Sequence, residues 1–244
     1  MKYSVVIPIH NEEDSVVALC RALKKVFSGI PAAYEIIFVD DASTDRSVER
    51  LRTTGSETRG MMIVRLADRR GLATALQAGF DRASGERIVT LDGDLQNDPA
   101  DIPKLIQKME EGFDVVCGWR KKRSDPILKK ISSKIANYFR RILMKEKIHD
   151  VGCTLKIFKK EVLKSLRLSG ALHRFLSLLV VRQGWRIAEV PVSHHPRKFG
   201  SSKFGIGRRL VEGLVDACRI QFTDPQKIMK APDYTIKEII KNDG

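Results

Sequence analysis

The sequence predicts an α/β fold in which helices flank a mostly parallel β-sheet. Along the first half of the chain, short hydrophobic runs alternate with segments of helical periodicity, which is typical of repeated βαβ units. The runs are apolar at nearly every position, as expected of strands that are buried on both faces. With 244 residues, 43% of them hydrophobic, the chain is long enough to bury a sizeable core.

The first strand is expected over 4–9, an apolar run that the polar segment 10–13 brings to an end. A helix is expected over 15–27, because its apolar residues recur at helical spacing on one face. The residues of that face are Val16, Leu19, Leu23 and Val26. A second buried strand over 34–39 and a short helix over 46–52 continue the pattern.

The same alternation extends to the end of the fifth expected strand. A third strand is expected over 61–66, followed by a helix over 72–83. A fourth strand over 88–91, a helix over 101–111 and a fifth strand over 114–118 follow. Crossovers between parallel strands are right-handed, and ligands of such sheets bind beyond the carboxyl ends of the strands.

Polar clusters lie at this edge of the expected sheet, after the ends of four strands. They occupy 10–12, 40–41, 68–71 and 92–96. Four such clusters at one edge indicate a binding site more strongly than a single cluster does. We therefore expect the site of the protein to lie there.

The last cluster has the pattern of a metal site. Asp92 and Asp94 are one residue apart, and strand alternation would point both carboxylates to one spot. If the chain stays extended, Gln96 adds a neutral oxygen. Oxygen ligands at this spacing suit Mg²⁺ or Mn²⁺. The alternative is a solvated acidic turn ahead of a helix that Asn97 or Asp98 caps.

Composition restricts the classes of partner and the compartment. The formal net charge is +14, from 44 Lys and Arg against 30 Asp and Glu, which favours nucleic acid, anionic lipid or phosphorylated substrates. The four cysteines lie far apart without a Cys-x-x-Cys pair, which argues against structural zinc and for a reducing compartment. Because no signal peptide and no apolar run of membrane-spanning length is recognisable, we expect a soluble or peripherally attached protein without a transmembrane span.

Three motifs at the strand ends resemble the opening motifs of family 2 glycosyltransferases. They are VVIPIHNEE over 5–13, VDDASTD over 39–45 and LDGDLQNDP over 91–99. The resemblance is greatest to polyprenyl-phosphate sugar synthases, such as dolichol-phosphate mannose synthase and bacterial undecaprenyl-phosphate glycosyltransferases. It extends to about Phe222 and implies a GT-A-type, Rossmann-like catalytic domain over 1–222 that uses a nucleotide-sugar donor.

The resemblance implies a nucleotide pocket at the end of the first strand, lined by Pro8, His10 and Glu12. A carboxylate such as Glu12 suits ribose hydroxyls, and Asp40 is placed to accept a hydrogen bond from a base N–H. The alternative makes Glu12 a charge in the first turn of a helix. Asp41 is expected to order the loop rather than to contact the ligand.

For the acidic motif, the resemblance implies metal binding by Asp94 and Gln96. Asp92 is expected to act in catalysis, reaching the sugar or the ribose directly, or the metal through water. Gly93 belongs to the same donor-binding segment. The segment 69–71, Arg-Arg-Gly, resembles an Asn-x-Gly segment of the family and is expected to form either an anion site or a solvated charge pair.

On the acceptor side, the resemblance implies phosphate contacts by Arg120 and Arg174. Asp150 opens a segment, 150–158, that resembles the family's acceptor-side motif, and it is the candidate carboxylate there. A sugar hydroxyl needs a general base, whereas a phosphate monoester is already mostly ionised, so Asp150 would orient groups for a phosphate acceptor. The alternative is a turn residue that fixes Gly152.

A segment over 189–203, EVPVSHHPRKFGSSK, resembles the family's phosphate-binding loop. The resemblance implies that Arg197, Ser202 and Lys203 bind the donor diphosphate. Glycine and serine residues would let this loop close over the donor. The histidine pair 194–195 lacks a third ligand, so we expect loop structure or diphosphate contacts rather than a metal site.

Two amphipathic helices are expected beyond the fifth strand. One, over about 126–146, combines an apolar stripe with lysines and arginines, which suits a membrane surface; packing against the catalytic domain is the alternative. The second covers about 205–222, and a polar tail is expected over 223–244. Either the two helices attach the protein to a membrane, or an integral-membrane partner does, or the acceptor is not a lipid.

These features and the resemblance predict an inverting, metal-dependent transfer of a sugar from a GDP- or UDP-linked donor to a polyprenyl phosphate. The enzyme is expected at the cytoplasmic face of a membrane. A family 2 transferase with a soluble or glycan acceptor is the second hypothesis. A nucleic-acid-binding module is the third, but it rests on charge alone, and no nucleic-acid partner is expected because no such motif is recognisable.

Overall fold

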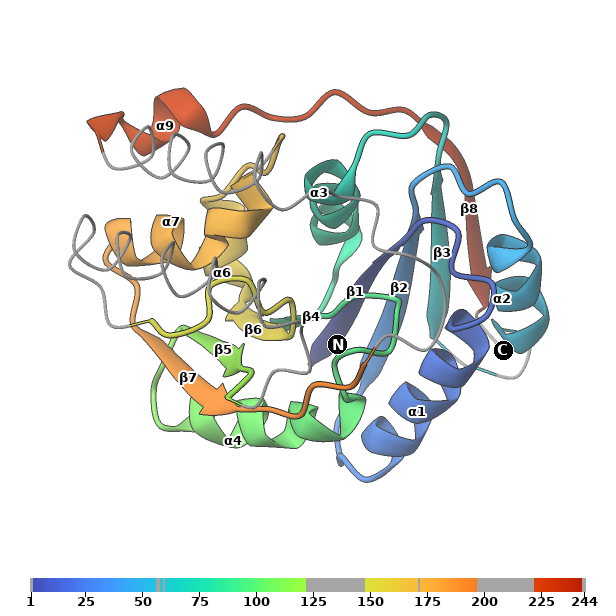
Figure 1. Cartoon of the computed structure of the whole chain (residues 1–244), viewed down its shortest axis with the longest axis horizontal. Coiled ribbons are helices and arrows are strands. Elements are labelled where there is room, and N and C mark those ends of the chain that lie inside the picture. Colours follow the sequence, from blue (N-terminus) through green and yellow to red (C-terminus); the bar gives the residue numbers. More distant parts are fainter. Residues whose placement is uncertain are drawn as a thin grey trace.

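The sheet has eight strands within the described residues, which in this computed structural model are 2–55, 58, 60–121, 148–170, 172–196 and 222–242. Their order across the sheet is β7-β5-β6-β4-β1-β2-β3-β8 (Figure 1). The strands are β1 Tyr3–Ile9, β2 Tyr34–Asp40, β3 Met61–Leu66, β4 Arg87–Thr90, β5 Val115–Trp119, β6 Lys156–Lys159, β7 Ile187–Pro191 and β8 Ile236–Asn242. Strands β3, β2, β1 and β4 run parallel, and β7 runs parallel to β5, which confirms the predicted mostly parallel sheet.

Helices cover both faces of the sheet. They are α1 Val16–Ser28, α2 Ser47–Gly55, α3 Leu72–Arg82, η1 Pro99–Asp101, α4 Ile102–Glu110, α6 Lys160–Lys164, η2 Leu172–Phe175, α7 Leu176–Arg182 and α9 Pro225–Ile228. Strand alternation sends Val6 into the core beneath α3, α6 and α7, and it sends Val5 and Ile7 into the core beneath α1, α2 and α4. The elements expected up to residue 118 are all present, with small differences at their ends.

Two strands differ from the expectation. Strand β6 lies between β4 and β5 and is antiparallel to both. Strand β8 pairs antiparallel with β3 at the edge of the sheet, so the segment expected as a polar tail contributes a strand, Ile236–Asn242, that was not expected. Half-buried and exposed residues alternate along β8, which is the pattern of a strand with one face on the core.

The described ranges contain no helix with both the length and the hydrophobicity needed to cross a bilayer. The amphipathic helix expected over 126–146 lies outside the described residues, and so does the one expected over 205–222, apart from its last residue.

Helix α3 lies close to β1 and β2 because it carries a glycine where it meets them. A Cβ atom on Gly79 would lie 2.3 Å from Val6 Cγ1 and 3.1 Å from Val39 Cγ2. Protein interiors are close-packed, so a side chain there would push the helix away from the sheet.

The variant Gly79→Ala tests this packing. An alanine in a helix normally stabilises a protein relative to glycine, but overpacking a core costs about 1–3 kcal/mol. We expect a net loss of about 1 kcal/mol in the free energy of unfolding, measured by urea denaturation. In the control Gly29→Ala, the nearest atom lies 3.6 Å from the new Cβ, and no loss is expected. Equal stability of the two variants would contradict the account.

Candidate functional site

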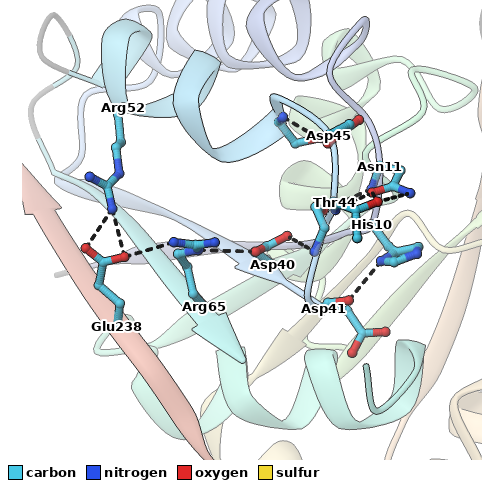
Figure 2. A network of polar contacts seen from close by, with 11 residues as sticks. His10, Asn11, Asp40, Asp41, Thr44, Asp45, Arg52, Arg65 and Glu238 are labelled. Atoms are coloured by element: carbon cyan, nitrogen blue, oxygen red, sulfur yellow. Dashed lines mark hydrogen bonds and ion pairs between the residues drawn. The ribbon is translucent and has the colours of Figure 1, made fainter. Parts of the chain in front are cut away.

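The polar clusters after β1, β2 and β3 meet in one hydrogen-bonded group. The Asp41 carboxylate accepts the backbone N–H groups of Arg70 and Gly71, at 2.6 and 2.9 Å. His10 Nδ1 lies 2.8 Å from the carbonyl oxygen of Asp41 (Figure 2). Asp41 therefore orders the loops, as expected, and the two amides ahead of α3 already hold a carboxylate of the chain itself.

Residues of the expected nucleotide pocket surround this group. Pro8 is buried in β1, whereas His10 and Glu12 are half-buried just beyond the strand. Glu12 Oε2 accepts a hydrogen bond from Ser15 Oγ at 2.8 Å, next to the start of α1. This contact agrees with the alternative that Glu12 serves the first turn of the helix, and its contact with a ribose stays a prediction.

Asp40 is the last residue of β2, and its side chain is fully buried. Its Oδ1 accepts the backbone N–H of Ser43 at 3.0 Å, and its Oδ2 lies 3.4 Å from Arg65 Nε (Figure 2). The carboxylate is thus fixed in orientation and has a cationic neighbour. Because the side chain has no exposed surface in this structure, a hydrogen bond from a base to Asp40 stays a prediction.

The acidic motif forms a turn after β4 and does not continue the strand. Strand β4 ends at Thr90, and Leu95 has a φ angle of 59°. Gly93 is required in this turn, since a Cβ atom there would lie 2.8 Å from Ile9 Cγ2. The turn, and not strand alternation, brings the two carboxylates of the motif near each other.

Burial and the neighbouring carboxylate together raise the pKa of one of these groups. Burial, and next the Asp94 carboxylate, raise the pKa of Asp92 to about 6, while a hydrogen bond with Thr154 and the charges of Arg120 and Lys156 act in the other direction. Asp94 is 8% exposed and accepts the backbone N–H of the residue two positions on, at 3.1 Å. A divalent cation would remove the repulsion, so this donor set fits Mg²⁺ or Mn²⁺.

Gln96 is less well placed as a metal ligand than the sequence suggests, because its prediction depended on an extended chain. The side-chain Nε2 of Gln96 donates to the carbonyl oxygen of His195 at 3.4 Å. The backbone carbonyl oxygen of Gln96 accepts the backbone N–H of His195 at 2.9 Å. Within the described residues, no group of three or more His, Cys, Asp or Glu side chains could hold a metal. Two carboxylates would therefore share an ion with phosphate oxygens and water, which is the usual binding mode of Mg²⁺.

Arg120 and Asp150, expected as separate catalytic groups, form one buried ion pair. Arg120 Nε and Nη2 donate to Asp150 Oδ2 and Oδ1 at 2.7 and 2.9 Å, and the Arg120 backbone N–H donates to Oδ2 at 3.2 Å. Glu189 of β7 accepts the backbone N–H of Asp150 at 2.9 Å. This two-pronged geometry suits Asp150 to holding the guanidinium in place.

A small pocket, partly open to solvent, lies beside Asp92. It is lined by Leu72, Leu76, Thr90, Leu91, Asp92, Thr154, Lys156, His173 and Leu176. Lys156 is 4% exposed and donates to the carbonyl oxygens of Val151 and Cys153. The sequence prediction did not include Thr154 and Lys156. A lysine within an otherwise apolar strand segment could have indicated Lys156.

The phosphate-loop residues Arg197, Ser202 and Lys203 lie outside the described residues. The chain that leads to them is fastened beside the acidic turn, because His194 forms a β-bridge with Asn97. The residue before it, Ser193, donates its backbone N–H to Asp101 Oδ2 at 2.6 Å. Arg174 lies half-buried in η2 and is not among the residues that line the pocket.

Two curated relatives are similar over most of the chain. A dodecaprenyl-phosphate galacturonate synthase of Rhizobium johnstonii is 42% identical over 213 residues, which cover 85% of this chain and 63% of the relative. An undecaprenyl-phosphate 4-deoxy-4-formamido-L-arabinose transferase of Klebsiella pneumoniae is 34% identical over 230 residues, which cover 93% of this chain and 70% of the relative. The chain thus spans 63% and 70% of the lengths of these relatives, and both names agree with the polyprenyl-phosphate type that the motifs resemble.

Solved structures of glucosyl-3-phosphoglycerate synthase from Mycobacterium tuberculosis share the fold. The complex with Mg²⁺ and uridine diphosphate aligns with a TM-score of 0.70 at 19% identity, covering 96% of this chain and 86% of that chain. The complex with Mn²⁺, uridine diphosphate and glucosyl-3-phosphoglycerate has a TM-score of 0.70 at 18% identity, and the alignment covers 99% of this chain and 90% of that chain. These alignments confirm the predicted GT-A-type fold. Residues 4–167 also match the model of Glycosyl transferase family 2, and the chain belongs to that family.

Proposed function

We propose that the chain catalyses an inverting, metal-dependent transfer of a sugar from a UDP- or GDP-linked donor to a polyprenyl phosphate. The observation that carries the proposal is the position of the Asp92–Asp94 turn beside the buried Arg120–Asp150 pair. Two carboxylates suit a cation and the diphosphate that it binds, and an arginine suits a second phosphate. The names of the curated relatives support this class of acceptor.

On the donor side, Asp94 and Asp92 would hold the divalent cation, with Gln96 as a further candidate. When bound, such a cation supplies neutralisation of the charge that develops on the leaving nucleoside diphosphate. Asp40 would accept a hydrogen bond from the base, and Arg197, Ser202 and Lys203 would bind the diphosphate. A fold neighbour solved with Mg²⁺ and uridine diphosphate supports this kind of donor.

On the acceptor side, the phosphate itself would be the nucleophile. The second pKa of a phosphate monoester is near 6, so at neutral pH it is mostly ionised and needs no general base. Arg120 would bind the phosphate, and Asp150 would hold Arg120 in place. The acceptor would attack C1 of the sugar in line, opposite the departing diphosphate, which inverts the configuration.

We further propose that the enzyme works at the cytoplasmic face of a membrane, where a polyprenyl phosphate would be presented. The net charge of +14 supports contact with an anionic surface. The helices expected over 126–146 and 205–222, or an integral-membrane partner, would provide the attachment.

A soluble acceptor is the second candidate, because the fold neighbour was also solved with phosphoglyceric acid. A hydroxyl nucleophile on such an acceptor would need a general base. The Asp150 carboxylate is already occupied by three hydrogen bonds from Arg120, which favours the phosphate nucleophile. Nucleic-acid binding keeps only the net charge as support, and we do not propose it.

A donor panel tests the proposed reaction. Purified protein with Mn²⁺ and liposomes containing polyprenyl phosphate is expected to release nucleoside diphosphate from one of the sugar donors. The panel contains UDP-glucose, UDP-N-acetylglucosamine, UDP-galacturonate and GDP-mannose. Liposomes without the phosphate lipid, and 3-phosphoglycerate in solution, are the controls. If no donor releases nucleoside diphosphate in the presence of either the lipid or the soluble acceptor, the proposal is contradicted.

The variant Asp94→Asn tests the metal assignment. Removing one charge from the acidic turn is expected to lower transfer by about 100-fold or more, since changes even to groups that only orient metal ligands cost 10–100-fold. Mn²⁺ should raise the melting temperature of the wild type and not that of the variant. Asp14→Asn, at an exposed carboxylate outside the acidic turn, should behave like the wild type. If Asp94→Asn kept wild-type activity in the presence of a chelator, Asp94 would be excluded as a metal ligand.

The variant Asp150→Asn separates a positioning role from a general-base role. Loss of the charged partner of Arg120 is expected to lower kcat/KM for the lipid phosphate by about 10- to 100-fold, about 1.4–2.7 kcal/mol. The pH–rate profile should keep its shape, because no proton passes through Asp150. Arg120→Lys, which keeps the charge but loses the two-pronged pair, should show a similar loss. Recovery of Asp150→Asn at high pH would indicate a base instead.

A further inference from the structure

Asn97, at the end of the acidic motif, is a buried residue that contacts two other segments of the site. It is 3% exposed. Its Nδ2 donates to Thr154 Oγ1 at 2.8 Å, and its Oδ1 accepts from Cys153 Sγ at 3.7 Å. The residue also forms the β-bridge with His194 through its backbone. The side chain therefore serves the segment before β6, whereas the backbone serves the chain that leads to the expected phosphate loop.

Helix capping does not account for the Asn97 side chain. The N-cap of η1 is Asp98, whose Oδ1 accepts the backbone N–H of Ala100 at 2.9 Å. Of the two caps that the sequence allowed, the structure thus uses the second. The hydrogen bonds that satisfy the buried amide of Asn97 go to the segment before β6 instead.

The direction of these hydrogen bonds follows from the group at which they begin. Burial raises the pKa of the Cys153 thiol to about 11, so the thiol keeps its hydrogen at neutral pH. Asn97 Oδ1, at 3.7 Å, is nearer to the sulfur than the Leu155 carbonyl oxygen, at 3.9 Å. With its oxygen towards the thiol, the amide presents its NH₂ group to Thr154, whose hydroxyl oxygen accepts. The single hydrogen of that hydroxyl is left for another acceptor.

That acceptor is the Asp92 carboxylate. Thr154 and Asp92 both line the small pocket, and a hydrogen bond joins their side chains. An ionised carboxylate only accepts hydrogen bonds, so Thr154 is the donor. The four side chains of Cys153, Asn97, Thr154 and Asp92 therefore form one directed chain of hydrogen bonds.

The amide of Asn97 selects the rotamer of Thr154. The backbone of Thr154 is already fixed, because its carbonyl oxygen accepts Thr90 Oγ1 at 2.7 Å. On a fixed backbone, the staggered rotamers of threonine exchange the positions of its hydroxyl and methyl groups. A donor at position 97 favours the rotamer that turns the hydroxyl towards it and towards Asp92. An apolar side chain there would remove this preference.

We infer that Asn97 is a positioning residue for the divalent cation, which acts through Thr154 to fix the orientation of the Asp92 carboxylate. The inference rests on the proposed function, in which Asp92 and Asp94 hold the cation. Neither Asn97 nor Thr154 needs to touch the cation. One hydrogen bond leaves further acceptor positions on the two oxygens of Asp92, so ligation stays open.

The variant Thr154→Val keeps the shape of the side chain and removes its hydroxyl. Mn²⁺ binding in the presence of UDP or GDP is followed by the loss of the electron paramagnetic resonance signal of free Mn²⁺, with nucleotide alone as the blank. The Kd for Mn²⁺ is expected to rise about 10-fold or more, the effect of losing a partner that orients a metal ligand. Thr154→Ser, which keeps the hydroxyl, should bind like the wild type. Excess Mn²⁺ should restore transfer in Thr154→Val.

The variant Asn97→Leu tests the asparagine itself. It removes the amide at similar volume, and the Kd for Mn²⁺ is expected to rise about two- to tenfold, the range of one neutral hydrogen bond. In the double variant Asn97→Leu/Thr154→Val, the Kd should equal that of Thr154→Val alone, because Asn97 acts through Thr154. If Asn97→Leu does not fold, Asn97→Ala removes the same amide, and the same rise is expected.

The variant Thr58→Val is the matched control. It makes the same substitution at another buried threonine, 2% exposed, whose hydroxyl donates to the Thr54 carbonyl oxygen at 3.2 Å. Its melting temperature is expected to fall, because a buried hydrogen bond is lost. Its Kd for Mn²⁺ should be that of the wild type.

An unchanged Kd in Thr154→Val, or additive losses in the double variant, would overturn the role of Asn97 and leave the metal site standing. Equal losses in Thr58→Val and Thr154→Val would also overturn it, since both would then act through stability. Transfer by Thr154→Val that excess Mn²⁺ does not restore would make Thr154 a substrate contact instead. If the wild type binds no Mn²⁺ with either nucleotide, the proposed function fails, and the inference fails with it.

Discussion

Buried charge is the constraint on which this site depends. Taking an ionised side chain out of water costs on the order of several kcal/mol unless a partner offsets it. Arg65 lies next to Asp40, and Arg120 pairs with Asp150. At the acidic turn, burial and then the charge of Asp94 raise the pKa of Asp92, against a hydrogen bond with Thr154 and the charges of Arg120 and Lys156. An added cation at the acidic turn would offset both the burial of these carboxylates and their mutual repulsion. The same turn is where a nucleoside diphosphate would need that cation.

The direction of strand β6 brings the remaining charges to the same place. Because β6 is antiparallel to β4 and β5, its first residues lie at the edge where those two strands end. Lys156 pairs with Thr90 on one side and with Cys117 on the other. The segment that precedes β6 carries Asp150 and Thr154. Because this strand reverses direction, the residues expected to contact the acceptor lie at the same edge of the sheet as those expected to contact the donor.

Local patterns predicted the first half of the fold, and they failed where pairing is long-range. The strands and helices up to residue 118 follow from apolar runs and helical spacing, and the resemblance extended the prediction to the GT-A-type fold. Strand β8 was missed because it has one buried face and pairs with β3, far away in the sequence. The sequence identified Arg120 and Asp150 but not their pairing, which only tertiary structure creates. A turn at Leu95 replaces the extended chain on which the prediction for Gln96 depended, so a metal contact by Gln96 stays a prediction.

The central claim is that a divalent cation and a nucleoside diphosphate bind together at the acidic turn. Crystals grown with Mn²⁺ and UDP or GDP, measured at the manganese absorption edge, test it most directly. We predict an anomalous peak within coordination distance of Asp94, with diphosphate oxygens completing the shell and the base next to Asp40. Manganese bound elsewhere, for example at the exposed Asp98–His195 pair, or nucleotide bound away from this edge, would contradict the account.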